Sequence, residues 1–171
     1  MNYKFKTKPY AHQLKALERS WDREYFAYFM EMGTGKSKVL IDNASILYDK
    51  GEINGLLLIA PKGVYKNWYD GEIPTHMVDH IEKKVVLWET SNSSIEKIKE
   101  LNTMFATGTD FHILVMNVEA FSYPKATEFA RRFLSCHKAM MAIDESTTIK
   151  TPTANRTRNI VSLKPLAKYR R

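Results

Sequence analysis

The chain has 171 residues, of which 44% are hydrophobic, 12% aromatic and 26% charged, with only 7 glycines and 6 prolines. This length can fill one hydrophobic core, and the composition excludes a disulfide-stapled miniprotein, a collagen-like chain and a wholly disordered chain. We therefore expect a single domain over residues 1–171. The formal charge of +7 is uneven, because residues 146–171 hold seven of the 26 basic residues and none of the 19 acidic ones. This basic tail segment predicts a polyanionic partner.

Cysteine content and hydropathy bear on where the protein works. Cys136 is the single cysteine, so the chain cannot form an internal disulfide, and we expect Cys136 to serve packing rather than catalysis. There is no apolar run approaching about 18 residues and no secretory signal pattern at the N-terminus. We expect a soluble, cytoplasmic protein without a membrane partner.

Short apolar runs alternate with longer amphipathic stretches along the chain. The runs that predict strands are residues 26–30, 56–60, 84–88, 112–116 and 139–143. The stretches that predict helices are 12–24, 37–48, 64–73, 94–105 and 125–137, with turn residues at 50–51, 54–55, 91–93 and 107–110. Because strands alternate with helices and each apolar run is nearly continuous, the pattern predicts an α/β fold with a mostly parallel sheet flanked by helices on both faces.

The sequence Glu-Met-Gly-Thr-Gly-Lys-Ser at positions 31–37 lies between the first predicted strand and a predicted helix. Glycines let the backbone curl so that its N–H groups point at phosphate oxygens, and the helix N-terminus adds positive potential. Lys36 would reach the β- and γ-phosphates of ATP, and the Ser37 hydroxyl would ligate Mg²⁺. The alternative is a chance Gly-Lys-Ser at a turn, since Met30 replaces the first glycine of the general pattern. The predicted nucleotide-binding residues here are Met32, Gly33, Thr34, Gly35, Lys36 and Ser37.

An adjacent pair of carboxylates, Asp144 and Glu145, follows the last predicted strand. Open α/β sheets bind ligands at the carboxyl ends of their strands. Asp144 would hold Mg²⁺, and Glu145 would orient and deprotonate the water that attacks the γ-phosphate. The alternative is an exposed acidic turn, which the phosphate loop upstream makes the weaker interpretation. We therefore predict Lys36 and Glu145 as catalytic residues and Ser37 and Asp144 as metal ligands.

The order of these motifs resembles that of a known family. Pro-Tyr at 9–10 with Gln13, then positions 31–37, then Asp-Glu-Ser at 144–146, resembles the first RecA-like lobe of superfamily two helicases, and most closely the Swi/Snf-type DNA-dependent ATPases. In that branch a non-glycine residue at the position of Met30 is usual. The resemblance covers nearly the whole chain and implies a RecA-like P-loop NTPase fold. It departs at Thr147, where relatives often have a histidine that couples nucleotide state to motion.

The resemblance also implies roles for residues outside the two main motifs. Gln13 would read the adenine edge, although a solvated glutamine is the alternative. Ile-Ala-Pro-Lys at 59–62 is similar to a family motif whose loop touches the nucleic-acid backbone, so Lys62 would contact phosphate unless it is only a solvated turn lysine. We expect Trp68 to pack in the core rather than stack on a base. Asn117 lies in a segment similar to the one that covers the tracking strand.

The basic tail segment acquires a narrower interpretation from the resemblance. Lys150, Arg156 and Arg158 become candidates for contacts to nucleic acid or to a second lobe, with a solvated tail as the alternative. We expect residues 168–171 to precede a strand that is not in this sequence. His76 and His80 are spaced by four residues, but no third ligand accompanies them, so we predict no zinc site.

Two functions stay open from the sequence. In the first, the chain is the N-terminal ATP-binding lobe of a DNA helicase or translocase that binds Mg-ATP and nucleic acid. The resemblance implies double-stranded DNA as the polymer, a second RecA-like lobe, in cis or in trans, for efficient hydrolysis, and a bacterial or phage-infected cell, or the nucleus if the source is eukaryotic. Arginine fingers from that lobe would contribute about 10³ to 10⁵ in rate, so this chain alone would hydrolyse ATP slowly. In the second, the chain is a P-loop nucleotide-binding or regulatory module without motor activity.

Overall fold

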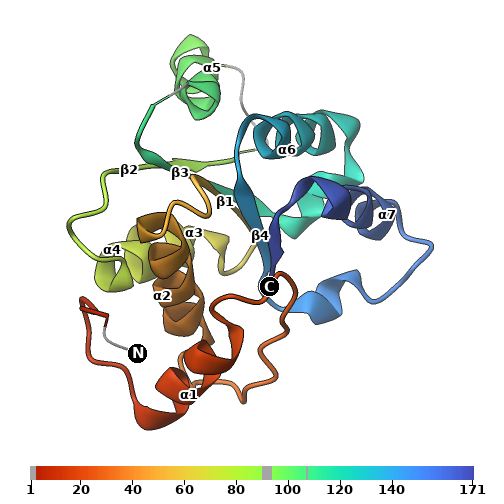
Figure 1. Cartoon of the computed structure of the whole chain (residues 1–171). Helices are drawn as coiled ribbons and strands as arrows, with labels where there is room; N and C mark the ends of the chain where they lie inside the picture. The colour runs from red at the N-terminus through yellow and green to blue at the C-terminus, as the bar shows by residue number, and fades with distance from the viewer. Residues whose placement is uncertain (1–2, 90–93, 107) are drawn as a thin grey trace.

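The computed structural model describes residues 3–89, 94–106 and 108–171, so the turn predicted at 91–93 and the start of the one at 107–110 lie outside the described residues. Within the described part, five strands form one parallel sheet in the order β2-β3-β1-β4-β5 (Figure 1). This arrangement confirms the predicted α/β fold. The strands are β1 (Gly55–Ala60), β2 (Lys83–Leu87), β3 (Phe111–Asn117), β4 (Ala139–Ile143) and β5 (Tyr169–Arg170).

Helices cover both faces of the sheet, as predicted (Figure 1). The α-helices are α1 (Ala11–Ser20), α2 (Lys36–Asp49), α3 (Tyr65–Asn67), α4 (Ile73–His76), α5 (Ile95–Asn102), α6 (Pro124–Cys136) and α7 (Asn155–Ser162). Short 3₁₀ segments are η2 (Thr103–Phe105), η3 (Val118–Ser122), η4 (Ser146–Ile149) and η5 (Lys164–Leu166), and η1 (Trp68–Glu72) is a π-helix. Cys136, at the end of α6, is exposed rather than packed.

The core forms two layers because successive side chains of a strand point to opposite faces. Leu56 and Leu58 of β1 pack with α2, α3 and α4, whereas Leu57 and Ile59 pack with α5, α6 and α7. All six residues of β1 are buried, as expected for a central strand covered on both faces. The near-continuous apolar runs of the sequence follow from this double burial.

Residues 26–30 do not form the first predicted strand. Their neighbour is β5, which has only two residues, and the pairing is reduced to one bridge between Tyr25 and Arg170. Beyond this bridge the N–H groups of Phe29 and Met30 bond to carbonyls two residues earlier, so the backbone curls toward the phosphate loop. The apolar character of the segment comes instead from packing of Tyr28 and Met30 against the cluster between α1 and α2.

The helix predicted at 64–73 is broken into α3, η1 and α4. In a regular helix the Pro74 ring would crowd the carbonyl four residues earlier and could not donate to it. The chain adopts a wider π turn, in which the Ile73 N–H bonds to the Trp68 carbonyl five residues back. Trp68 is the first residue of this π turn, and its side chain is buried in the core layer that contains Leu56 and Leu58.

The basic tail segment is folded, and residues 168–171 contain a strand themselves, because Tyr169 and Arg170 pair with Met140 and Met141 of β4. Sequence reasoning missed this strand because two residues are too few to show an apolar pattern. Helix α7 was also missed. It packs against η3, where Asn159 Nδ2 donates to the Phe121 carbonyl over 2.7 Å.

Candidate functional site

The phosphate loop connects the curled segment to α2. Gly33 and Gly35 both adopt left-handed conformations, with φ of 77° and 78°, which glycine enters without a steric penalty. Gly35 is the N-cap of α2 and leaves the first N–H groups of that helix free of intrahelical partners. Thr34 closes the loop from within, because its hydroxyl donates to the Glu31 carbonyl over 2.6 Å. Met32 is 87% exposed.

The Lys36 ammonium crosses this loop. It donates to the carbonyls of Met30 at 3.0 Å and Glu31 at 3.1 Å. A phosphate bound by this ammonium would compete with these two carbonyls for its N–H groups. The neighbouring Ser37 hydroxyl makes no hydrogen bond to another described residue and is available as a ligand.

Asp144 follows β4 directly, at the carboxyl edge of the sheet. Its N–H bonds to the Ile59 carbonyl at 2.8 Å, and its Oδ2 accepts the indole Nε1–H of Trp68 at 2.9 Å. Trp68 is 4% exposed, which confirms core packing rather than base stacking. The indole therefore fixes one carboxylate oxygen of Asp144 and leaves the other without a partner among the described residues.

Glu145 has φ 53° and ψ 56°, the only left-handed conformation of a non-glycine residue in the described part of the chain. Such a conformation costs about 1 to 3 kcal/mol and persists where the surroundings impose it, often at functional sites. Here the Glu145 carbonyl accepts both the N–H and the hydroxyl of Thr148, at 2.9 and 3.0 Å. The turn holds the carboxylate outward, at the mouth of the cavity described next.

A cavity of about 400 Å³ brings the two motifs together, since Lys36, Ser37, Asp144 and Glu145 all line it. Arg171 lines the same cavity from the edge of the sheet. The two motifs are far apart in the sequence, so their spacing alone could not show this proximity. The donor set is one ammonium, one hydroxyl and two carboxylates, which suits a phosphate chain with a bound Mg²⁺.

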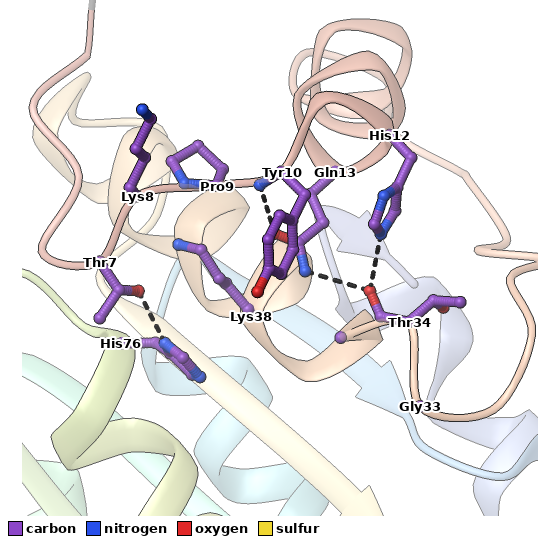
Figure 2. A pocket seen from close by; sticks show the side chains of 11 residues that line it. Thr7, Lys8, Pro9, Tyr10, His12, Gln13, Gly33, Thr34, Lys38 and His76 are labelled. Carbon is purple, nitrogen blue, oxygen red and sulfur yellow. Dashed lines mark hydrogen bonds between the residues drawn. The ribbon is translucent and has the colours of Figure 1, made fainter.

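A second cavity, of about 670 Å³, is lined by Gly33, Thr34 and Gly35 of the phosphate loop and by residues in and before α1 (Figure 2). Gln13 is 4% exposed and lines it, with its Oε1 accepting the Tyr10 N–H at 2.9 Å and its Nε2 donating to the Thr34 carbonyl at 3.0 Å. Gln13 is therefore not a solvated glutamine. His12, which the sequence reasoning did not single out, donates to the same carbonyl at 3.0 Å.

A buried ion pair stands beside this second cavity. Lys38, which lines the cavity, donates to Asp42 Oδ2 over 2.7 Å, and both side chains are almost fully buried. Burial raises the pKa of Asp42 to about 6, against the opposing effect of the Lys38 ammonium. The other oxygen of Asp42 is buried without a hydrogen-bond partner. The i,i+4 spacing of this pair is visible in the sequence, but its burial is not.

A polar network joins the N-terminal helix to β5. Arg171 donates through Nε to Asn43 Oδ1 at 2.7 Å and through a terminal nitrogen to the Ser20 carbonyl at 2.9 Å. Tyr28 completes the network with hydrogen bonds to Ser20 and Asn43, and burial raises the pKa of its phenol. The four residues come from four separate segments, so no sequence spacing could reveal them.

The residues expected to touch nucleic acid lie at the same carboxyl edge. Lys62 is exposed beyond β1, and Asn117 is buried at the end of β3. Glu119 ties these two loops together, because its Oε2 accepts the Lys62 backbone N–H at 3.2 Å and Asn117 Nδ2 at 3.3 Å. Asn117 is therefore committed to Glu119, and sequence reasoning did not assign Glu119 a role.

Three basic residues of the tail segment are expected to contact nucleic acid or a second lobe: Lys150 directly follows η4, and Arg156 and Arg158 are on α7. Lys150 and Arg158 are exposed and Arg156 is half-buried, and none of the three makes an ion pair with a described residue. Thr157 anchors the start of α7 by donating to the Ile149 carbonyl at 3.3 Å. The cations are thus displayed from a folded element and not from a solvated tail.

The two spaced histidines face different partners. His76 Nδ1 lies 2.8 Å from the Thr7 hydroxyl, and His80 Nε2 lies 2.9 Å from Asp49 Oδ1 (Figure 2 shows the first pair). The ring of His76 lines the second cavity, and burial lowers its pKa.

Among the described residues, no helix is long and apolar enough to cross a membrane.

The parallel sheet, the glycine-containing loop that opens α2 and the acid pair after β4 define a RecA-like P-loop NTPase fold. The chain belongs to the SNF2-related domain family, which matches residues 28–169. The resemblance to a Swi/Snf-type first lobe is confirmed by this match and by the fold.

One solved structure is similar to this chain over almost its whole length. The SWI2/SNF2 ATPase core of Sulfolobus solfataricus, solved in complex with dsDNA, is similar to this chain with a TM-score of 0.70 and 20% sequence identity. The match covers 99% of this chain and 32% of that one, so the chain spans about a third of that relative's length. No curated protein matches the chain.

Proposed function

We propose that this chain is the ATP-binding lobe of a DNA-dependent ATPase of the translocase type. The observation that carries the proposal is the single cavity lined by Lys36 and Ser37 from the phosphate loop and by Asp144 and Glu145 from the edge of β4. Phosphoryl transfer to water needs a phosphate cradle, a metal ligand and a water-orienting base in one place. These four side chains supply those groups, and the SNF2-related family supports the assignment.

Two features of the site fit Mg-ATP: the conformation of the phosphate loop and two oxygen atoms that could bind the metal. The left-handed glycines Gly33 and Gly35 open the loop for close approach of an anion. The Ser37 hydroxyl and the second oxygen of Asp144 have no competing partner among the described residues. Mg²⁺ held by these two groups would neutralise charge on the β- and γ-phosphates. Met32 and Thr34 would contribute backbone groups, and Gln13 would read the adenine edge from the second cavity.

The hydrolytic step falls to Lys36 and Glu145. Glu145 would orient a water in line with the γ-phosphate and take its proton as the new P–O bond forms and the bridging bond to the β-phosphate breaks. Lys36 would stabilise negative charge on the γ-phosphate oxygens, having left the carbonyls of Met30 and Glu31. Because arginine fingers from a second lobe supply about 10³ to 10⁵ in rate, we expect slow turnover by this chain alone.

Duplex DNA is the polyanion that we propose as partner. The relative from Sulfolobus was solved with dsDNA, and this chain has cations without an ion-pair partner among the described residues, in the loop after β1, after η4 and on α7. Phosphate groups of the DNA would be contacted by Lys62, Lys150, Arg156 and Arg158. Asn117 would hold the loop that faces the DNA strand along which the protein moves. Such contacts give sequence-independent binding that weakens as salt rises.

Nucleotide binding by the Lys36→Ala variant tests the first part of the proposal. We expect wild-type protein to bind Mg-ATP in calorimetry and the variant to lose at least about tenfold in affinity, since a charge-assisted contact to phosphate is removed. Lys99→Ala, on the exposed face of α5, is the matched control and should bind as wild type does. Equal affinity of Lys36→Ala and wild type would refute the phosphate-loop assignment.

Stimulation by DNA separates the proposal from the non-motor module. The chain is joined to a second RecA-like lobe of the same family, and ATP hydrolysis is measured with duplex DNA, single-stranded DNA and RNA. We expect duplex DNA to raise the rate of hydrolysis. Nucleotide binding with no response to any of the three polymers would instead assign the chain to a nucleotide-binding or regulatory module.

A further inference from the structure

The carbonyl of Thr34 is held by two side chains from the first turn of α1 (Figure 2). His12 Nε2 and Gln13 Nε2 both lie 3.0 Å from this oxygen. A carbonyl oxygen can only accept, so both nitrogens donate, and His12 carries a proton on Nε2. Two hydrogen bonds from consecutive residues of α1 thus hold the Thr34 carbonyl, in the middle of the phosphate loop.

This fastening decides where a neighbouring N–H group points. The peptide between Thr34 and Gly35 is planar and trans, so its C=O and N–H point in opposite directions. With the carbonyl drawn toward α1, the Gly35 N–H is turned away from α1. Thr34 lies between two left-handed glycines, which give this peptide unusual rotational freedom. External donors are therefore needed to keep one orientation.

In the proposed function Gln13 also contacts the adenine base, and this contact competes with its hydrogen bond to Thr34. Its Oε1 already accepts the Tyr10 N–H, and its Nε2 is the group that would turn toward a purine in the second cavity. Any such movement weakens its hold on Thr34. His12 points at the same oxygen from the exposed side, and its ring stacks on Tyr10 at 5.8 Å with an interplanar angle of 12°.

We propose that His12 is a positioning residue for the phosphate loop. Its Nε2–H holds the Thr34 carbonyl so that the Gly35 N–H stays aimed at the polyphosphate of a nucleotide when Gln13 engages the base. The inference rests on the proposed function, because it assumes that the loop binds polyphosphate. It predicts that His12 acts on phosphate affinity and not on base affinity.

Two substitutions isolate the Nε2–H. His12→Phe keeps a planar ring beside Tyr10 and removes the donor, whereas His12→Gln returns an N–H near the position of Nε2. Binding of Mg-tripolyphosphate, Mg-ATP and adenosine is measured by calorimetry for both variants and wild type, with thermal unfolding as the check on folding. His12 is exposed, so both variants are expected to fold.

We expect His12→Phe to bind tripolyphosphate and ATP about three- to tenfold more weakly, the range expected for one lost hydrogen bond, with adenosine affinity unchanged. His12→Gln should recover most of the loss, which a role in packing alone would not produce. Unchanged tripolyphosphate affinity in His12→Phe would overturn the inference, as would a loss confined to adenosine. Wild-type protein that binds neither ATP nor tripolyphosphate would instead remove the proposed function.

A double-mutant cycle with Gln13→Ala tests whether the two donors share one acceptor. When Gln13 is truncated, His12 is the remaining donor, so His12→Phe should weaken tripolyphosphate binding more in that background than in wild type. Additive losses would show that the two side chains act on separate groups and would overturn the shared hold on Thr34.

Discussion

Trp68 and Asp144 are 76 positions apart in the sequence, yet the indole Nε1–H donates directly to the carboxylate Oδ2 over 2.9 Å. The hydrogen bond joins the π turn after β1 to the acid pair after β4. It places a buried aromatic residue directly behind the carboxylate that we propose as a metal ligand, where it acts as an outer partner that orients the ligand.

Trp68→Phe removes this donor while keeping an aromatic side chain in the core. We expect affinity for Mg-ATP to fall about tenfold, the lower end of the effect of losing an outer-shell partner of a metal ligand, with a smaller change for ATP without Mg²⁺. Trp88→Phe is the matched control, since Trp88 is equally buried but belongs to the opposite core layer. Equal losses in the two variants would show that Trp68 serves only packing.

Glu145 combines a left-handed backbone conformation with the proposed role of base in ATP hydrolysis. Glu145→Gln should retain Mg-ATP binding and lose turnover in a protein that contains both lobes, because an amide cannot take the proton of the attacking water. Glu145→Gly should lose turnover as well but raise the free energy of unfolding by about 1 kcal/mol, because glycine adopts a left-handed conformation without cost. Urea denaturation measures the second effect, and a destabilised Glu145→Gly variant would contradict the strain.

Asp42 predicts a pH dependence of stability. Its pKa is raised from 3.8 to about 6 by burial, so the folded protein binds this proton more tightly than the unfolded chain. The contribution of Asp42 to the free energy of unfolding is therefore fully present below pH 3.8 and is lost as the pH rises through about 6.

Asp42→Asn should abolish this part of the pH dependence, as measured by denaturation across that interval. Its stability near neutral pH should also fall, because Lys38 loses its counter-charge. The slope against pH, rather than the absolute stability, is therefore the diagnostic quantity. The exposed Asp70→Asn variant should keep the wild-type slope. An unchanged slope in Asp42→Asn would assign the titration to another group.

Glu119 gives a prediction with an unusual sign. Removing an acid beside a DNA-binding edge ordinarily raises affinity for DNA, because repulsion is lost. If Glu119 positions the loops of Lys62 and Asn117, Glu119→Ala should instead lower affinity for a labelled duplex at low salt. Glu128→Ala, on the exposed part of α6, is the control and should not weaken binding. Tighter binding by Glu119→Ala would refute the positioning role.

Arg158 tests the basic segment by salt dependence. If its guanidinium contacts one phosphate, Arg158→Ala should reduce the slope of log affinity against log salt by about 1 and weaken binding similarly for all duplex sequences. Lys99→Ala should leave the slope unchanged. A normal slope in Arg158→Ala would place α7 outside the DNA interface and favour contact with a second lobe.

Sequence reasoning succeeded for features that are encoded by neighbouring residues, namely four strands and the phosphate loop. The apolar runs of β1 to β4 revealed the sheet because double burial removes polar positions, and the loop at 31–37 was recognisable because glycines and Lys36 must be adjacent to act. It failed at residues 26–30, where Tyr28 and Met30 pack on the cluster between α1 and α2, Phe29 is exposed, and the backbone has almost no strand to pair with. The same pattern therefore described two different structures.

Contacts between distant segments were out of reach of sequence reasoning. His12 matters because of a carbonyl 22 residues away, and Glu119 because of a loop 57 residues away. Neither residue belongs to a motif whose spacing implies its partner. The raised pKa of Asp42 likewise depends on burial, which a lysine four residues earlier does not predict.

The network around Arg171 has a consequence for how the protein folds. Its hydrogen bonds to Asn43 and Ser20 close sequence separations of 128 and 151 residues. During synthesis, at roughly 5 to 20 residues per second, α1 and the start of α2 leave the ribosome many seconds before their partner exists. We therefore expect the sheet around β1 and β3 to form first and α1 to dock last. The wall that α1 gives to the second cavity would be the latest part of the chain to mature, and the most exposed to misfolding or to capture by chaperones.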